Sequence, residues 1–194
     1  GPTMNRKLFD YIAASPSPYH AVAHSAETLR AAGFLPLSEG EDWDLTPGQG
    51  YYVTRNGSSL IAFRARRDFS GFLMTASHCD SPTFKIKENA ELTGSGCRRL
   101  AVEKYGGMLM STWMDRPLGI AGRVLLRKGS GIESRLLDLG GACAVIPNVA
   151  IHMNRKANDG YSWNPAVDLL PLWGSGEEKG FFRPTLAMAL ACRE

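Results

Sequence analysis

The chain has 194 residues, of which 44% are hydrophobic and 21% are charged, and its formal net charge is +3. This composition is typical of a folded globular protein and excludes a disordered chain. Lys and Arg are scattered along the sequence, so we expect no nucleic-acid partner. No apolar run approaches the roughly 18 residues of a membrane span, so we expect no membrane partner either.

The cysteines and the N-terminus indicate the compartment. The first residues, GPTMNRKLF, contain no apolar stretch like that of a signal peptide. The cysteines at Cys79, Cys97, Cys143 and Cys192 lie far apart and show no CxxC spacing. This usage is typical of free thiols in a reducing compartment rather than of a disulfide frame, so we expect a cytoplasmic protein.

Two helices are predicted at the start of the chain. Apolar side chains recur at helical spacing within residues 5–14. In the stretch SPSPYHAV, Ser17 is a good N-cap and Pro18 stands at the first helical position, which tolerates proline. The second helix is expected over residues 18–32, with Gly33 as its C-terminal stop.

A hairpin and a buried strand are predicted next. The segments YYVTR and SSLIAFR flank Asn56 and Gly57, the two residue types that best accept the positive φ angles of a tight hairpin turn. Residues 71–77, GFLMTAS, form a short apolar run of the kind that a strand covered on both faces shows, and the run ends at His78. These elements predict an α/β beginning.

The pattern changes near residue 90. From Lys85 onward, short alternating segments are separated by glycine, which predicts a β-rich module with tight turns. One hairpin is expected to turn at Gly129–Gly131, and a final helix is expected to begin near Pro184. We therefore divide the chain into residues 1–90 and residues 91–194, in an overall α+β or α/β class.

The histidines are the first candidates for metal ligands. His20 and His24 are four residues apart on one helix face, but HAVAH lacks the glutamate of the zincin motif HExxH, and half-buried structural histidines are the commoner case. His78 ends the predicted strand, where ligands collect in α/β sheets. Its ring could bind zinc through one nitrogen while Asp80 orients the other, although a polar strand end would show the same residues.

Other polar residues are weaker candidates. His152 lies in IPNVAIHMNR, an apolar, strand-like run in which a structural histidine is the simpler interpretation. Glu177 and Glu178 lie in GSGEEKG and are most simply a solvated loop. No glycine cluster fits GxGxxG or a P-loop, and no GxSxG elbow is present, so neither a nucleotide site nor a serine hydrolase is supported.

Several stretches together carry a resemblance. The chain resembles the M18 family of metallo-aminopeptidases, the aspartyl aminopeptidases, through seven matches that run in family order. They are SPSPYHAV (15–22), AGFLPLSE with Trp43 after it, YYVTRNGSSLIAF (51–63), ASHCDSP (76–82), VEKYGG with STWMDRPLGIAGRV (102–124), IPNVAIHMNR (146–155) and LLPLWG (169–174).

The resemblance implies a fold and an activity. Residues 1–90 would be the N-terminal part of a zinc-peptidase α/β domain, and residues 91–194 an inserted, β-rich dimerisation domain, left incomplete. Members of the family are soluble homo-oligomers that remove Asp or Glu from peptide N-termini with two zinc ions. By the same resemblance, His78 is a zinc ligand, Asp80 orients it, and His152 reaches a neighbouring subunit's active site and helps to bind substrate.

The resemblance also implies that most of the site is missing. A two-zinc centre needs about five protein ligands and a general base, and the family supplies the others after the region matched here. Glu177 and Glu178 do not stand at the family's Glu-Glu position. We therefore expect this chain to be inactive alone and to be an N-terminal fragment; the alternatives are a non-catalytic assembly or binding module, or an unrelated β-rich protein.

Overall fold

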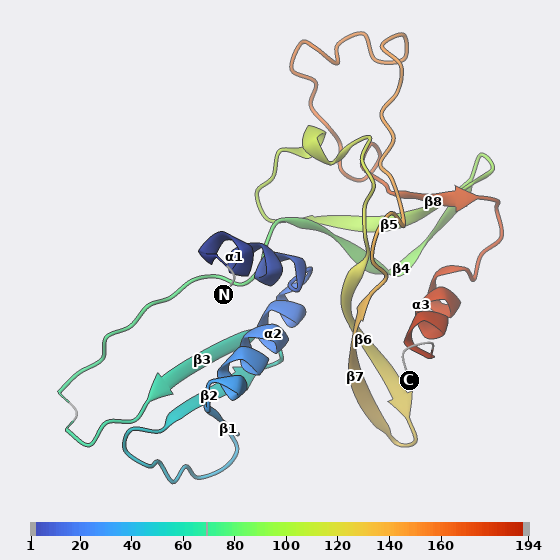
Figure 1. Cartoon of the computed structure of the whole chain (residues 1–194). Helices are drawn as coiled ribbons and strands as arrows, with labels where there is room; N and C mark the ends of the chain where they lie inside the picture. Colours follow the sequence, from blue (N-terminus) through green and yellow to red (C-terminus); the bar gives the residue numbers. More distant parts are fainter. Residues whose placement is uncertain (1–2, 69, 192–194) are drawn as a thin grey trace. The chain divides into compact units, whose positions relative to one another are not determined.

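The computed structural model describes residues 3–68 and 70–191 (Figure 1). Backbone contacts divide the chain into two compact units, which are described separately. The first takes in the residues up to Ser81 together with Gly122–Leu136, and the second takes in Pro82–Ala121 and the residues from Leu137 onward. The predicted domain boundary after residue 90 stays a prediction. Within the described ranges, every helix is too short or too polar to cross a bilayer.

The first unit begins with the two predicted helices. They are α1 (Met4–Ala13) and α2 (Pro18–Ala31), and both predictions are confirmed. The Ser17 hydroxyl oxygen accepts the backbone N–H of His20 at 3.3 Å, as an N-cap does. Helix α2 buries Ala21, Val22 and Ala26, whereas none of the residues of α1 is buried.

A small sheet follows in the first unit. Its strands are β1 (Leu35–Leu37), β2 (Gly50–Arg55) and β3 (Ser59–Arg64), with β2 in the centre, parallel to β1 and antiparallel to β3. The turn residues Asn56 and Gly57 both have positive φ, 53° and 63°, so the predicted hairpin is confirmed.

The predicted buried strand at residues 71–77 is wrong. Residues 70–82 have no regular secondary structure; Leu73 is fully exposed and Met74 nearly so. A strand forms only where a neighbouring strand satisfies its backbone N–H and C=O groups. In the described sheet, β3 pairs with β2 alone, and no strand pairs with residues 71–77.

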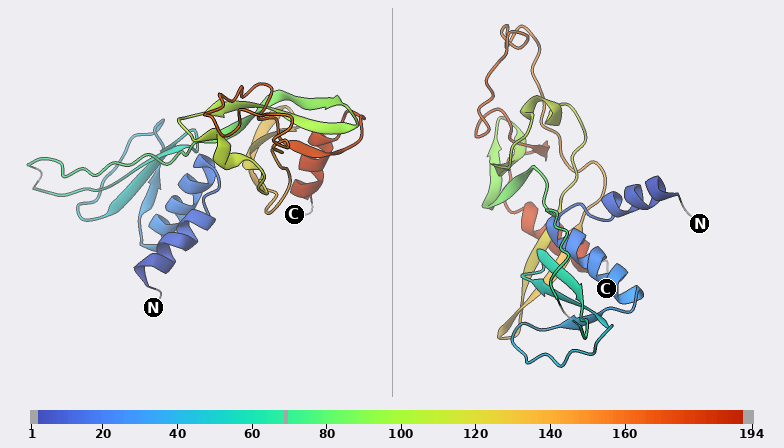
Figure 2. Two further views of the ribbon diagram at one scale, coloured as in Figure 1. Left: turned by 90° about the horizontal axis from the view of Figure 1, so that it is seen from above. Right: turned by 90° about the vertical axis from the view of Figure 1, so that its left-hand side faces the viewer.

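The second unit is built on a three-stranded antiparallel sheet. Strand β5 (Cys97–Tyr105) lies between β4 (Thr83–Gly94) and β8 (Leu172–Ser175), and β4 contains an irregularity between Ile86 and Glu91. Helix α3 (Phe182–Ala191) lies beside this sheet (Figure 2). Its Phe182 belongs to one buried cluster with Leu100 and Val102. The tail helix predicted near Pro184 is therefore confirmed, starting two residues earlier.

The other elements complete the second core and the predicted hairpin. A short 3-10 helix, η1 (Met110–Trp113), lies beside the buried cluster of Met114, Ile146 and Leu169. Strands β6 (Ala121–Lys128) and β7 (Gly131–Asp138), most of whose residues belong to the first unit, form the hairpin that the sequence places at Gly129–Gly131.

One carboxylate ties the sheet of the second unit to its helix. Glu91 accepts the backbone N–H of Gly180 at 2.5 Å and that of Phe182 at 2.7 Å, at the N-terminus of α3. The bond from Phe182, and then that from Gly180, holds the pKa of the Glu91 carboxyl below its ordinary value of 4.5. The carboxylate thus caps two otherwise unsatisfied donors and lies where the helix dipole favours negative charge.

We predict that Glu91→Gln destabilises the chain by about 1 kcal/mol, which is typical for the loss of a helix cap, and lowers Tm by about 3 °C at pH 7. Because the pKa of Glu91 is lowered in the folded state, its contribution is complete above the ordinary value of 4.5 and is lost as pH falls through the lowered pKa. Thermal unfolding followed by circular dichroism from pH 7 to pH 3 measures this, and the difference in Tm between the two proteins should shrink as pH falls.

Glu88→Gln is the matched control, because Glu88 lies on the same strand and is exposed. An equal loss of Tm in both variants, or a difference between Glu91→Gln and the parent chain that does not shrink as pH falls, would contradict the capping role.

Candidate functional site

His78 has the geometry of an oriented imidazole. Its Nδ1 lies 2.8 Å from the backbone carbonyl oxygen of Asp80 and 3.1 Å from the carboxylate Oδ1 of the same residue. Both partners are acceptors here, so Nδ1 carries the hydrogen and donates it. In the neutral ring, the lone pair is then on Nε2, on a side chain that is 81% exposed. A metal-binding histidine is commonly held in this way, by a carboxylate or carbonyl at its other nitrogen.

His78 has no companions for a metal ion within the part of the chain that the structure describes. No group of three or more His, Cys, Asp or Glu side chains is placed so that it could hold a metal there. The neighbouring Cys79 thiol instead donates to the carbonyl oxygen of Ser58, at 3.2 Å, in the turn between β2 and β3. A zinc ion takes about four ligands, so the described residues supply one candidate ligand and do not fit a complete zinc site.

His20 and His24 have structural roles. The Nδ1 atom of His20 lies 2.7 Å from the hydroxyl oxygen of its N-cap, Ser17. The ring of His24 packs against Tyr11 with 5.6 Å between ring centroids, which joins α2 to α1. Both rings are thus engaged in contacts within α1 and α2. This agrees with the absence from HAVAH of the glutamate of HExxH, which favours structural histidines over metal ligands.

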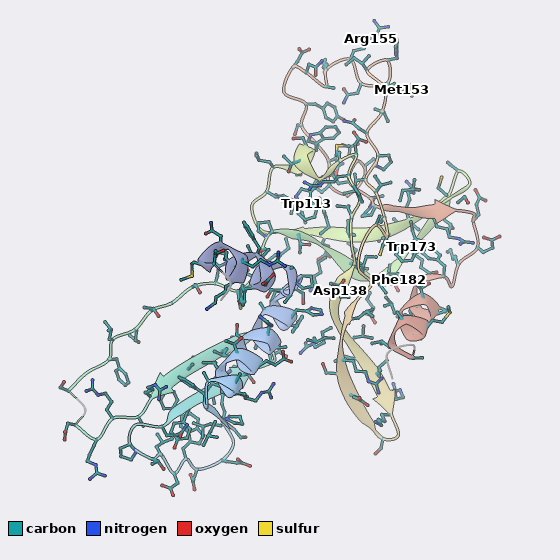
Figure 3. All side chains as sticks on the ribbon, in the orientation of Figure 1. Trp113, Asp138, Met153, Arg155, Trp173 and Phe182 are labelled. Atoms are coloured by element: carbon teal, nitrogen blue, oxygen red, sulfur yellow. The ribbon has the colours of Figure 1, made fainter. Side chains whose placement is uncertain are left out.

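His152 lies on a long exposed loop of the second unit. The structure places residues 147–164 in turns and irregular segments, so the strand-like interpretation of this run is wrong. Its alternating apolar residues have no sheet to pack on and are exposed: Val149, Ile151 and Met153. Figure 3 shows Met153 and Arg155 on this loop, away from Trp173 and Phe182 in the core. His152 is thus an exposed loop histidine and not a core residue.

The paired glutamates of the GSGEEKG stretch hold the end of the β4–β5 hairpin. Glu178 forms an ion pair with Arg98 at 2.6 Å, and Glu177 accepts the backbone N–H of Gly96 at 2.7 Å. The hydrogen bond from Arg98 holds the pKa of the Glu178 carboxyl below its ordinary value. Both residues are in a solvated loop, as predicted, and neither contacts a histidine that the sequence indicates as functional.

The first unit contains a hollow that the sequence analysis did not predict. Its volume is about 540 Å³, and helix α2, strands β1 and β2 and the β6–β7 hairpin line it. Arg123 closes one side: its guanidinium lies 4.3 Å from the centre of the Tyr19 ring, and its Nη1 donates to the Asn56 carbonyl at 2.9 Å. Neither His78 nor Asp80 lines this hollow. No local sequence pattern predicts this hollow, because Arg123 and Asn56 are 67 residues apart.

The chain is similar in sequence to proteins of one family. The profile of the family described as aminopeptidase I zinc metalloprotease (M18) matches residues 11–184. A probable M18 family aminopeptidase 2 of Pseudomonas putida is 43% identical over 193 residues, which are 97% of this chain and 45% of that protein. Its namesake in Pseudomonas aeruginosa is 47% identical over 172 residues, which are 87% of this chain and 40% of that protein. The chain thus spans less than half the length of these relatives.

Solved structures show the same relationship. A chain of the Ape4 and Nbr1 complex superposes with a TM-score of 0.83 at 38% identity, covering 90% of this chain and 34% of that one. For mApe1 of Chaetomium thermophilum the TM-score is 0.83 at 27% identity, and the match covers 96% of this chain and 46% of that one. For the S. cerevisiae mApe1 dodecamer the TM-score is 0.66 at 34% identity, and the match covers 76% of this chain and 36% of that one. The predicted fold class, an incomplete mixed α/β fold, is confirmed.

We predict that the 194-residue chain retains well under one zinc ion per molecule after gel filtration, because a single imidazole holds zinc weakly. Metal content by mass spectrometry measures this. His78→Ala should leave the zinc content unchanged, as should His24→Ala, its control on α2. One zinc ion per chain that disappears only in His78→Ala would show that the chain completes a site by itself.

Proposed function

The chain belongs to the M18 family of aminopeptidase I zinc metalloproteases, and on that premise we propose that it forms part of an aminopeptidase that removes Asp or Glu from peptide N-termini. The observation that carries the proposal is the geometry at His78, whose Nδ1 is held by the carbonyl and the carboxylate of Asp80. An imidazole held by a carbonyl and a carboxylate at one nitrogen is the arrangement in which proteins commonly present the other nitrogen to a metal ion.

His78 and Asp80 have separate roles in this proposal. His78 is a zinc ligand through Nε2, and Asp80 is a positioning residue that fixes the tautomer and the direction of the ring. Zinc, when bound in such peptidases, polarises the peptide carbonyl and activates water. The proposed enzyme uses two zinc ions, whose remaining ligands and general base come from protein beyond the described residues.

His152 is proposed to act in a neighbouring subunit. Its exposure on an 18-residue irregular loop, residues 147–164, fits a side chain that contacts another molecule rather than its own core. A homo-oligomer built through the β-rich part would bring this loop to a second subunit, where His152 would contact substrate. The similar S. cerevisiae protein, mApe1, is a dodecamer.

An alternative is a non-catalytic module that keeps only the assembly surface. The absence of a three-ligand group from the described residues favours this alternative for the chain by itself.

We place the protein in the cytoplasm, because Cys79, Cys97 and Cys143 are free thiols without a disulfide. The third hypothesis, an unrelated β-rich protein, is wrong, since the family profile spans most of the chain.

The test of catalysis uses the chain alone and a fusion. We predict no hydrolysis of aspartyl p-nitroanilide by the 194-residue chain with added zinc, above the rate of its His78→Ala variant. Fusion to the part of the Pseudomonas putida relative outside the matched region should restore hydrolysis, with Asp and Glu substrates preferred over a Leu substrate.

Within that fusion, His78→Ala should abolish turnover, and Asp80→Asn should lower kcat/KM by about 10- to 100-fold, as loss of a ligand-orienting partner does. His24→Ala should leave activity unchanged. A fusion that assembles and binds zinc but hydrolyses no aminoacyl substrate would favour the assembly module. A preference for the Leu substrate would contradict the proposed specificity for Asp and Glu but not the aminopeptidase activity.

The role of His152 across subunits can be tested by mixing. Fusions carrying His78→Ala and His152→Ala should each be inactive alone, because one loses its ligand and the other its substrate contact. Co-expression should recover activity, since a mixed oligomer contains active sites with an intact His78 and a partner's intact His152. No recovery, in oligomers shown by mass spectrometry to contain both chains, would assign His152 to its own subunit.

A further inference from the structure

The hollow of the first unit has the size and the lining of a small-molecule site. Its volume of about 540 Å³ lies within the roughly 300–1,000 Å³ that such sites occupy, and every residue that lines it belongs to the first unit. The buried part of the lining is apolar and includes Val22 and Ala26 of α2 and Tyr52 of β2. The exposed part carries hydroxyl groups, those of Thr54 on β2 and Ser134 on β7. An apolar lining with a few polar groups is typical of ligand pockets.

Arg123 is held in a fixed position in the wall of this hollow. Its guanidinium lies 4.3 Å from the centre of the Tyr19 ring. Its Nη1 donates to both oxygens of Asn56, to the backbone carbonyl at 2.9 Å and to the side-chain Oδ1 at 3.0 Å. Because these three contacts already order the side chain, a ligand that binds to it pays little further conformational entropy.

Half of the Arg123 guanidinium remains open to a ligand. The two Asn56 oxygens use Nη1, whereas Nε and Nη2 have no hydrogen-bond partner among the described residues. Nε and Nη2 together form the fork that binds a carboxylate or a phosphate through two parallel hydrogen bonds. The side chain is half-buried, so water screens its charge less than it would at the open surface.

The charges of the lining favour an anion at Arg123. Among the described residues that line the hollow, Arg30 is the other arginine and Glu27 is the one carboxylate. Glu27 and Arg30 are three residues apart on α2, so they are neighbours on the helix surface and their charges offset each other. Tyr19, which contacts Arg123, lies about 12 Å from Glu27 along the helix axis. The positive charge of Arg123 is therefore the one without a nearby carboxylate in the lining.

We propose that this hollow binds a small molecule that carries a carboxylate or a phosphate group on an apolar body. The anionic group accepts hydrogen bonds from Nε and Nη2 of Arg123, and the apolar body packs on Val22, Ala26 and Tyr52. Neither His78 nor Asp80 lines the hollow, so the proposal goes beyond the proposed function and does not rest on it.

Arg64 provides a matched comparison within the same unit. Its guanidinium lies 4.8 Å from the centre of the Phe34 ring, and its Nη1 donates to the carbonyl oxygen of Gly48 at 3.0 Å. Arg64 and Arg123 thus have the same kind of support, but Arg64 does not line the hollow. If such support served the fold alone, the two arginines would respond alike to an anion.

The experiment titrates three probes into the ¹⁵N-labelled 194-residue chain and follows them by nuclear magnetic resonance. The probes are phenyl phosphate, phenylacetate and, as the neutral control, benzyl alcohol. The two anions should shift the Nε–H signal of Arg123 and the amide signal of Thr54, with a Kd of about 1 mM for molecules of this size. Benzyl alcohol should bind at least tenfold more weakly. The tighter anion shows whether the natural ligand carries a phosphate or a carboxylate.

Two outcomes of the titration would overturn the proposal. One is binding of benzyl alcohol as tight as that of the anions, which would leave Arg123 without a role. The other is the absence of any shift at Arg123 at the highest soluble concentration of both anions.

Two pairs of variants make the test specific. Arg123→Leu should weaken binding of the tighter anion at least tenfold, whereas Arg64→Leu should leave its Kd unchanged. Ser134→Trp keeps Arg123 in place but fills the hollow from its exposed rim, so it should abolish binding. Ile132→Trp, at a side chain that is 74% exposed on the same strand and outside the lining, should not. Equal weakening in both arginine variants, or binding that survives Ser134→Trp, would overturn the site.

The same titration on the fusion to the Pseudomonas putida relative tests whether the hollow stays open in a longer protein. The fusion should bind the tighter anion with the Kd of the 194-residue chain. Loss of binding would assign the hollow to the remainder of the subunit and overturn the proposal. A fusion that binds the anion but hydrolyses no aminoacyl substrate counts against the proposed aminopeptidase activity only.

Discussion

The structure depends on the requirement that a strand's backbone groups find hydrogen-bond partners on a neighbouring strand. Where the chain supplies both neighbours, as β4 and β8 do for β5, a sheet forms and buries Leu100 and Val102 beneath α3. Within the described residues β3 has one neighbour only, and the sheet stops there. Residues 71–77 have no strand partner in those same ranges, and apolar side chains that would suit an interior strand remain in solvent.

This constraint also determines what His78 can do. The local contacts of the residue are complete, because the carbonyl and carboxylate that orient its ring lie only two residues along the chain. The other ligands of the proposed zinc site are not among the described residues, where no group of three or more candidate ligands comes together. Local geometry alone therefore gives an oriented imidazole at His78 and nothing more of such a site.

The sequence predicts what is local and fails where contacts are distant. Ser17 with Pro18, and Asn56 with Gly57, act within a few residues, so α2 and the β2–β3 hairpin were predicted correctly. The contacts of Glu91 with the start of α3, and of Arg123 with Asn56, join residues far apart, and no local pattern indicates them.

The same limit explains the two failed strand predictions, at residues 71–77 and around His152. In both segments the apolar residues suit a strand, but their pattern does not show whether a neighbouring strand is present to pair with it. The His78 and Asp80 pair could be recognised only through its resemblance to a family, because spacing alone also fits a polar strand end.

The most direct test of this account is the backbone conformation of residues 71–77 in the isolated chain, measured by nuclear magnetic resonance as the Cα and Cβ chemical shifts of Leu73 and Met74. The account predicts shifts close to random-coil values, beside clear strand shifts for Tyr52 in β2. Strand shifts at Leu73 and Met74 that do not depend on protein concentration would contradict it, because the chain would then complete its own sheet.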